Sequence, residues 1–222
     1  MKRCLILTGG KLSLAFAGSF LKKSKYEKVI AVDGGLEAAK ELGIIPDVIV
    51  GDFDTVRPEI LSYYRKMEHI IWEVHQPEKD DTDTELAIKR ALAMNCSHIT
   101  LLGATGGRLD HMIGNIHLLF PCLQKGTYAE IVDPQNRLYL IDGEHISPIL
   151  HLFGKYAVWG KYISFLPLTQ EVKGITLKGF KYPLTDRDIF IGTSLCISNE
   201  LVEEEGRITL SDGVLITVES HD

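Results

Sequence analysis

Two patterns of hydrophobic positions alternate along the first half of the chain. Short apolar runs rich in β-branched residues predict strands at Cys4–Thr8, Lys28–Val32, Val48–Val50, His69–Glu73 and His98–Leu102. Between them, amphipathic segments predict helices at Ser13–Lys23, Leu36–Leu42, Pro58–Lys66, Asp83–Ala93 and Leu109–Leu119. This alternation is typical of a parallel sheet covered by helices, in which ligands bind beyond the carboxyl ends of the strands.

The pattern changes after residue 125, where short segments are separated by turn residues and no long helical period remains. The strands predicted there are Ala129–Val132, Arg137–Ile141, His145–Leu150, Tyr156–Trp159, Tyr162–Phe165, Gly174–Lys178 and Val214–Glu219. They favour a smaller antiparallel sandwich or barrel. We therefore expect an α/β domain over residues 1–125 and a β-domain over residues 126–222.

Composition narrows the classes of function. The net charge of −6 argues against a general nucleic-acid binder, which normally has a basic face, but a bound metal ion could still attract phosphate. No apolar run is long enough to span a membrane. The four cysteines are scattered without metal-ligand spacing, which favours reduced thiols in a cytoplasmic protein.

Two acidic clusters lie where ligands are expected. Asp52 and Asp54 follow a predicted strand and point the same way along an extended chain, which favours a metal ion between them. Alternatively, Asp54 caps the helix that begins near Pro58. Asp80, Thr82 and Asp83 precede another predicted helix, for which Thr82 or Asp83 is a capping candidate, while a ligand role for the acidic residues stays open.

Glycine-rich turns follow two further strands. In the run Gly103-Ala-Thr-Gly-Gly-Arg108, adjacent glycines free backbone N–H groups for an anion, and the arginine adds a fork of donors. The spacing is not that of a P-loop, and an ordinary turn with a surface arginine is the alternative. Asp33-Gly34-Gly35 serves either a strand-to-helix turn or the close approach of a nucleotide.

Taken together, four motifs closely resemble the thiamin pyrophosphokinase family. They are Ala31-Val-Asp-Gly-Gly35, Pro46-Asp47 with Gly51-Asp-Phe-Asp54, Asp80-x-Thr82-Asp83, and Gly103-Ala-Thr-Gly-Gly-Arg-x-Asp-His111. The second half matches more loosely, through Thr176–Pro183, Gly192-Thr-Ser and Ile197-Ser-Asn-Glu200. The resemblance implies an α/β domain followed by a β-sandwich, and a homodimer with active sites between subunits.

The activity implied by this resemblance is transfer of pyrophosphate from ATP to the hydroxyl of thiamin, giving thiamin diphosphate and AMP. Asp52, Asp54 and Asp80 would hold Mg²⁺ on the triphosphate, with Asp83 nearby, and one of these carboxylates would accept the hydroxyl proton. The phosphate-binding and nucleotide-binding residues implied are Gly106, Gly107, Arg108, Asp110, Asp33 and Gly34, with Asp110 orienting either Arg108 or the nucleotide.

The thiamin pocket departs from the family pattern. Eukaryotic members carry a tryptophan near the C-terminus that stacks on the aminopyrimidine, and the corresponding stretch here offers Ile216. Ser198 and Asn199 are the polar candidates, with a turn between strands as the alternative. Two other functions remain open: a metal-dependent phosphatase or ADP-forming kinase, and a non-catalytic nucleotide or thiamin sensor. The identity of the products distinguishes them.

Overall fold

The structure is a computed structural model that describes residues 1–76, 78, 80–143 and 150–222. The chain forms two compact units. The first comprises residues 1–122 and 127–134, and the second comprises residues 123–126 and 135–222. Within the described residues, no helix combines the length and the apolar character that crossing a membrane requires.

The first unit contains a parallel sheet in the order β4-β3-β2-β1-β5-β6. Its strands are β1 (Arg3–Leu7), β2 (Lys28–Val32), β3 (Val48–Gly51), β4 (Ile71–Val74), β5 (His98–Leu102) and β6 (Tyr128–Val132). The central strands are buried on both faces, as expected for near-continuous apolar runs. The five strands predicted in this half are confirmed.

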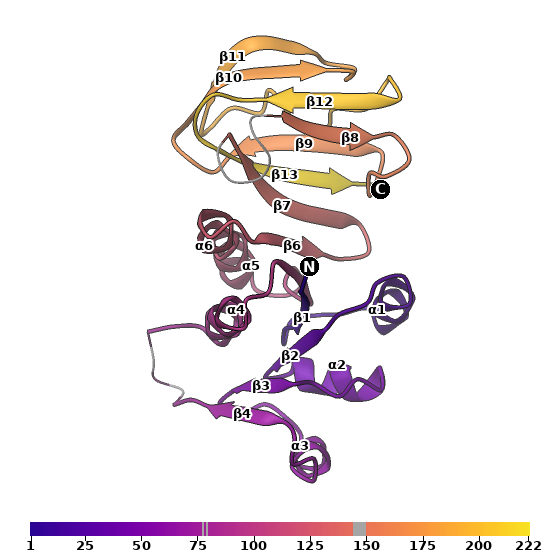
Figure 1. Ribbon diagram of the computed structural model, residues 1–222, viewed down its shortest axis with the longest axis vertical. Helices are drawn as coiled ribbons and strands as arrows, with labels where there is room; N and C mark the ends of the chain where they lie inside the picture. The colour runs from indigo at the N-terminus through magenta and orange to yellow at the C-terminus, as the bar shows by residue number, and fades with distance from the viewer. Residues whose placement is uncertain (77, 79, 144–149) are drawn as a thin grey trace. The chain divides into compact units, whose positions relative to one another are not determined.

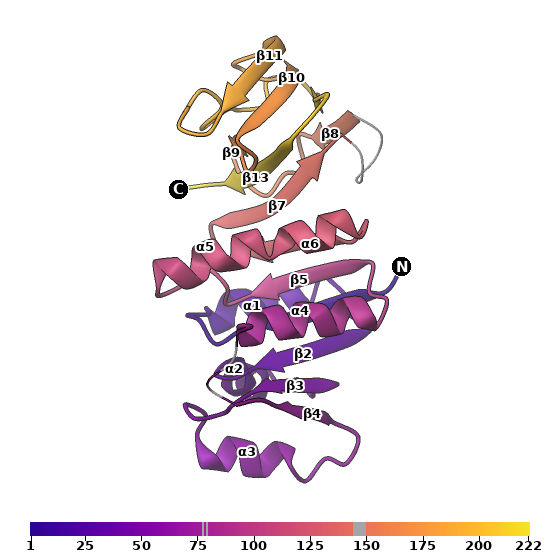
Figure 2. The ribbon, with the colours of Figure 1, turned by 90° about the vertical axis from the view of Figure 1, so that its left-hand side faces the viewer.

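Helices cover both faces of this sheet. Figure 1 shows α1 and α2 on one side and α4 and α5 on the other, and Figure 2 gives the perpendicular view. The helices are α1 (Leu14–Leu21), α2 (Gly35–Glu41), α3 (Pro58–Tyr64), α4 (Asp83–Ala93), α5 (Leu109–His117) and α6 (Leu119–Gln124). The five predicted helices are confirmed, and α6 was not predicted as a separate helix.

Local sequence explains several helix starts. The Ser13 hydroxyl accepts a hydrogen bond from the Phe16 N–H, and the Thr82 hydroxyl accepts one from the Glu85 N–H at 3.2 Å. These contacts satisfy backbone donors that a helix leaves free at its first turn. Pro58 begins α3, where its missing N–H costs nothing. The capping alternative is therefore correct for Thr82, while Arg57, not Asp54, precedes α3.

The second unit contains two sets of paired antiparallel strands. One has the order β7-β13-β9, and the other has the order β11-β10-β12-β8. Their strands are β7 (Asn136–Asp142), β8 (Leu150–Gly154), β9 (Tyr162–Pro167), β10 (Glu171–Lys178), β11 (Leu184–Phe190), β12 (Glu205–Thr209) and β13 (Val214–Ser220). Phe153, Phe165 and Phe180 meet edge to face in the core, with ring centroids 5.7–5.8 Å apart. An α/β sheet followed by a smaller antiparallel β-structure is thus confirmed.

Some predictions for this half are wrong. Segment Ala129–Val132 lies in β6, which pairs in parallel with β5 in the first unit and is not part of an antiparallel domain. A boundary at residue 125 therefore does not coincide with the division between compact units. Tyr156–Trp159 forms turns, and β11 and β12 were not predicted. Of the predicted strand His145–Leu150, residues 145–149 lie outside the described residues.

Candidate active site

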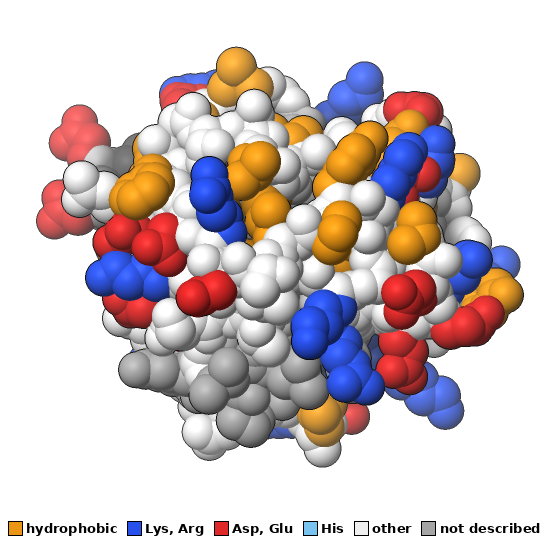
Figure 3. Space-filling model, turned by 90° about the horizontal axis from the view of Figure 1, so that it is seen from above, with side chains coloured by type: hydrophobic (Ala, Val, Ile, Leu, Met, Phe, Trp, Pro, Cys, Tyr) orange, Lys and Arg blue, Asp and Glu red, His pale blue; other side chains and the backbone are white. Residues whose placement is uncertain are grey.

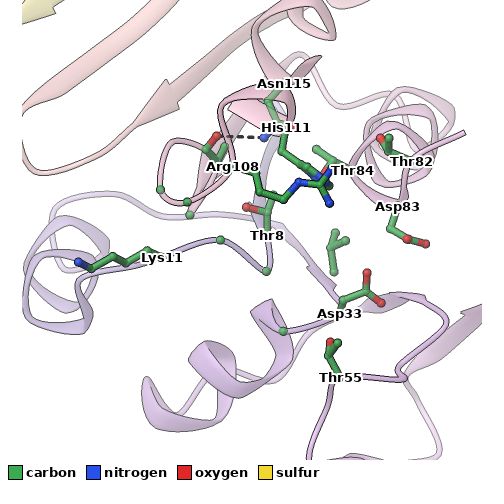
Figure 4. Close-up of a pocket in the computed structure, with 18 of the residues that line it drawn as sticks. Thr8, Lys11, Asp33, Thr55, Thr82, Asp83, Thr84, Arg108, His111 and Asn115 are labelled. Carbon is green, nitrogen blue, oxygen red and sulfur yellow. Dashed lines mark hydrogen bonds between the residues drawn. The ribbon is translucent and has the colours of Figure 1, made fainter. Parts of the chain in front are cut away.

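A cavity of about 630 Å³ lies in the first unit at the carboxyl ends of the strands. Thr8 directly follows β1, Asp33 follows β2 and Gly103 follows β5, and all three line it. The lining residues are Thr8, Gly9, Gly10, Lys11, Val32, Asp33, Gly34, Thr55, Asp80, Asp81, Thr82, Asp83, Thr84, Gly103, Ala104, Gly106, Gly107, Arg108, His111 and Asn115 (Figure 4). This is the edge at which a parallel sheet of this kind binds ligands.

One wall of the cavity is formed by two glycine-containing loops packed against each other. A side chain on Gly10 would strike the carbonyl oxygen of Gly103, and one on Gly106 would strike Lys11. Gly103 and Gly107 have φ angles of 79° and 102°, a region that favours glycine. The absence of side chains therefore brings two stretches of backbone together and leaves their polar groups accessible beside the cavity.

The opposite wall is acidic. Asp33 and Asp83 lie toward one end of the cavity, whereas Lys11 lies toward the other (Figure 4). Burial, the neighbouring negative charges of Asp83 and Asp52, and a hydrogen bond with Asp83 raise the pKa of Asp33 to about 7. The N–H of Phe53 opposes this shift by bonding the ionised carboxylate. These carboxylates are thus close enough to repel one another.

The chain is held in an unusual conformation around this acidic wall. Asp33 has a φ angle of 42° and Phe53 one of 64°, both in the left-handed region that side chains rarely adopt. The Asp33 N–H donates to the carbonyl of Val50 at 3.1 Å, which ties the end of β2 to β3. Strain of this kind persists where the surrounding structure enforces it, often at functional sites.

The three carboxylates predicted to hold metal have different surroundings. Asp80 lines the cavity, and Asp52 is near enough to Asp33 to influence its pKa. Asp52 also accepts a hydrogen bond from the Asp54 N–H at 3.1 Å, while Asp54 is exposed and is not a lining residue. Within the part of the chain that the structure describes, no three acidic, histidine or cysteine side chains form a group able to hold a metal ion. The predicted ligand set stays a prediction.

The chemistry of these donors nevertheless fits magnesium. All the candidates are carboxylate oxygens, the hard ligands that Mg²⁺ prefers, and a cation would offset the negative charge that Asp52 and Asp83 place beside Asp33. Mg²⁺ is usually held by one or two carboxylates together with water and substrate phosphates, so a complete protein cage is not required.

Arg108 and Asp110 form a two-pronged ion pair at the start of α5. The Arg108 Nε lies 3.1 Å from one carboxylate oxygen of Asp110 and its terminal nitrogen lies 2.5 Å from the other. The arginine lowers the pKa of Asp110 to about 2. Both side chains are exposed, so this pair contributes little to the stability of the fold. Of the two predicted roles of Asp110, the contact with Arg108 is present, and any contact with nucleotide stays a prediction.

Several lining residues were missed by sequence reasoning. Thr8 ends a predicted strand, and Lys11 and Thr55 come shortly after predicted strands, so their position was the one available signal. Asn115 is buried in α5 and donates to the carbonyl of Ala104 at 3.0 Å, which anchors the glycine turn. His111 lines this cavity and a neighbouring one of about 240 Å³. The predicted residues Gly34, Gly106 and Gly107 also line the cavity.

The candidates for a thiamin pocket lie in the second unit. Ser198 is exposed, with a φ angle of 56°, and its N–H donates to the Ser164 hydroxyl. Asn199 is buried, and its amide accepts from the N–H groups of Tyr182 and Glu200 and donates to the carbonyl of Tyr182. Asn199 also pairs with Ile163 in an isolated antiparallel β-bridge, so the turn alternative describes Ser198 and not Asn199.

Ile216 is the remaining candidate in this unit. It is partly exposed in β13, on the face opposite the buried side chains of Leu215 and Thr217. A partly exposed apolar side chain on a strand offers a surface for a flat ring, and its contact with thiamin stays a prediction.

Comparison with known proteins gives a consistent result over both units. Residues 19–131 match the model of the thiamin pyrophosphokinase catalytic domain, and residues 151–215 match that of the thiamin pyrophosphokinase vitamin B1 binding domain. The thiamine pyrophosphokinase of Bacillus subtilis is 36% identical over 197 residues, which cover 87% of each chain.

Solved structures agree with these matches. The crystal structure of the Bacillus subtilis thiamine pyrophosphokinase has a TM-score of 0.86 at 32% identity, with 100% of both chains covered. The thiamin pyrophosphokinase of Candida albicans has a TM-score of 0.80 at 18% identity, covering 99% of this chain and 89% of its own. That second likeness concerns the fold alone.

Proposed function

The chain belongs to the thiamin pyrophosphokinase family, and we propose that the cavity in its first unit is where ATP is bound for pyrophosphoryl transfer. The reaction is that of an ATP-dependent diphosphotransferase, which converts ATP and thiamin to AMP and thiamin diphosphate. We assign this cavity to ATP chiefly because its two walls differ in charge. One wall gathers carboxylates, and the other offers backbone and a guanidinium group.

The acidic wall suits the metal-binding half of a metal–triphosphate complex. We assign Mg²⁺ to Asp52, Asp54 and Asp80, with Asp83 beside them and Asp33 and Gly34 lining the nucleotide site. When bound there, the ion would neutralise charge that develops on the phosphoryl oxygens. The shared surroundings of Asp33, Asp52 and Asp83 support this assignment, because their charges already interact.

The glycine wall suits the phosphates themselves. Gly106 and Gly107 leave room for an anion to approach the backbone, and Arg108 presents a planar fork of donors. Asp110 holds that guanidinium group in one orientation through two contacts. Preorganised donors of this kind favour a transition state without needing to rearrange during the reaction.

The reaction requires little covalent chemistry from the protein itself. The thiamin hydroxyl oxygen attacks the β-phosphorus, and the bond from that phosphorus to the oxygen shared with the α-phosphorus breaks. AMP leaves with that oxygen, and the hydroxyl proton passes to one of the active-site carboxylates. Alignment of the attacking and leaving oxygens, together with charge stabilisation, accounts for catalysis in such transfers.

Thiamin is assigned to the second unit. Ser198 is the proposed polar contact and Ile216 the apolar wall, while Asn199 holds the turn that carries Ser198 through its three amide hydrogen bonds. A flat aromatic cation needs both kinds of contact. The match of residues 151–215 to a vitamin B1 binding domain supports this assignment.

We further propose a homodimer with active sites between subunits, located in the cytoplasm. Exposed apolar side chains support an interface, among them Phe190, Ile191, Leu195 and Ile197 in the second unit. Figure 3 shows hydrophobic side chains at several places on the face that it displays. The four cysteines are free, which agrees with a reducing compartment.

The decisive experiment identifies products by mass after incubation with Mg-ATP and thiamin. Equal amounts of AMP and thiamin diphosphate are expected. ADP with thiamin monophosphate would show attack on the γ-phosphorus, and free phosphate alone would indicate a phosphatase. Binding of ATP or thiamin without turnover would favour a sensor.

Subunit mixing tests the composite site. Asp52→Asn and Ser198→Ala proteins, each nearly inactive, should regain part of the activity when mixed under conditions of subunit exchange. Some heterodimers would then hold one site in which both residues are intact. Exchange shown by labelled subunits, with no recovered activity, would place each site within a single chain.

A further inference from the structure

The loop Gly9–Lys11 follows β1, which lies between β2 and β5 in the sheet. This loop is packed against the glycine turn of residues 103–107. A side chain on Gly10 would strike Gly103, and a side chain on Gly106 would strike the Cβ and the carbonyl oxygen of Lys11. The backbone of Lys11 is therefore fixed at the cavity wall, although its side chain is exposed and free to turn.

The two permanent cations among the lining residues differ in their contacts. Arg108 directs two nitrogens at Asp110. Lys11 forms no hydrogen bond or ion pair with any residue that the structure describes. Its ammonium group is thus the lining cation whose charge no neighbouring carboxylate offsets.

The direction of the Lys11 side chain excludes one explanation for this charge. Figure 4 shows it on the side of the glycine loops, pointing away from Asp33 and Asp83. It therefore does not serve to neutralise the acidic wall. The ammonium group also points away from Arg108 in Figure 4, but its flexible stem can carry the three donors over a range of positions, including toward an anion at the glycine loops.

We propose that Lys11 is a phosphate-binding residue for the nucleotide, acting on the glycine side of the cavity together with Arg108. This inference rests on the proposed function, because the anion is identified as a phosphate of ATP. Lys11 would supply a mobile point charge, whereas Arg108 supplies a fixed planar fork. The two residues would then contact different oxygens of the same polyphosphate.

The test compares Lys11→Met with Lys11→Arg and with Lys23→Met, an exposed lysine of the same region that does not line the cavity. Steady-state kinetics give kcat and the two KM values. Calorimetry with α,β-methylene-ATP, in which the scissile bridge is blocked, gives nucleotide affinity without turnover. Melting temperatures show that each variant is folded.

For Lys11→Met we expect KM for ATP to rise and analogue affinity to fall by about 10-fold to 100-fold, the range for a lost hydrogen bond to a charged group. KM for thiamin should stay unchanged. Lys11→Arg should restore most of the affinity, and Lys23→Met should match the wild type.

Unchanged analogue affinity in a folded Lys11→Met protein would overturn the inference. Equal losses for ATP and thiamin, together with a lower melting temperature, would also overturn it by showing a structural role. If the wild type forms no AMP, the proposed function fails, whereas the binding measurement still decides whether Lys11 holds the analogue.

Discussion

Gly51, the last residue of β3, offers a direct test of the acidic wall. Its φ angle is 150°, and a Cβ there would overlap a carboxylate oxygen of Asp33 and lie 3.3 Å from the ring of Phe53. Gly51→Ala must therefore displace Asp33 from its present position. Since a misplacement of about 1 Å can reduce a rate about 100-fold, we expect turnover to fall by roughly that factor.

The same substitution also strains the backbone, so a matched control is needed. Gly43, after α2, has a φ angle of 67° but no atom near the place of its missing side chain. Each alanine variant should cost about 1–3 kcal/mol of stability. At roughly 2–4 °C per kcal/mol, melting temperatures should drop by about 2–12 °C in both variants. Only Gly51→Ala should lose turnover.

The two variants are compared with the unchanged protein by two measurements. Calorimetry or fluorescence gives the melting temperature, and steady-state kinetics at saturating Mg-ATP and thiamin gives turnover. Normal turnover in folded Gly51→Ala would refute the reasoning, because Asp33 would then be dispensable or free to move. An equal loss of turnover in Gly43→Ala would show that backbone strain, not the position of Asp33, reduces activity.

Three further predictions concern other parts of the molecule. Asp52→Asn and Asp54→Asn should each lose about 100-fold in kcat at saturating Mg²⁺ while keeping their melting temperatures, and near-normal rates in both would remove the metal assignment. Arg108→Lys should lower kcat/KM for ATP at least about 10-fold, because the planar fork is lost; unchanged kinetics would make it a surface residue of an ordinary turn. Asn199→Ala should lower stability by about 1–3 kcal/mol in denaturant titration, since backbone groups of Tyr182 lose their partners.

The strands and site motifs of the first unit could be predicted because the sequence patterns that indicate them are local. Each strand is a short apolar run, each site motif follows a strand or precedes a helix, and parallel strands bring their carboxyl ends to one edge. Gly51 and Asp33 are brought together by packing between separate segments, and Asn115 reaches Ala104 through a hydrogen bond between a helix and the turn before it. The periodicity of hydrophobic residues along the sequence gives no information about such contacts.

The errors have equally specific causes. Periodicity cannot distinguish a parallel strand from an antiparallel one, so β6 was assigned to the wrong architecture. In β11 the run Thr185-Asp186-Arg187-Asp188 is polar and exposed, and it lacks the alternation that identifies a half-buried strand. The role of Asn199 was equally hidden, because its partner Tyr182 is 17 residues away.

The acidic wall also shows why this site is suited to a ligand that brings a cation. Burial and the charges of Asp83 and Asp52 raise the pKa of Asp33 from 3.8 to about 7. The folded protein therefore holds that proton more tightly than the unfolded chain does. The favourable contribution of protonated Asp33 is complete below about pH 4 and is lost as the pH rises to about 7. As the pH rises through about 7, ionisation of Asp33 thus opposes folding, and a divalent ion accompanying ATP would remove that opposition. The same carboxylates would then contribute to the binding free energy of the metal–ATP complex and to its placement for catalysis.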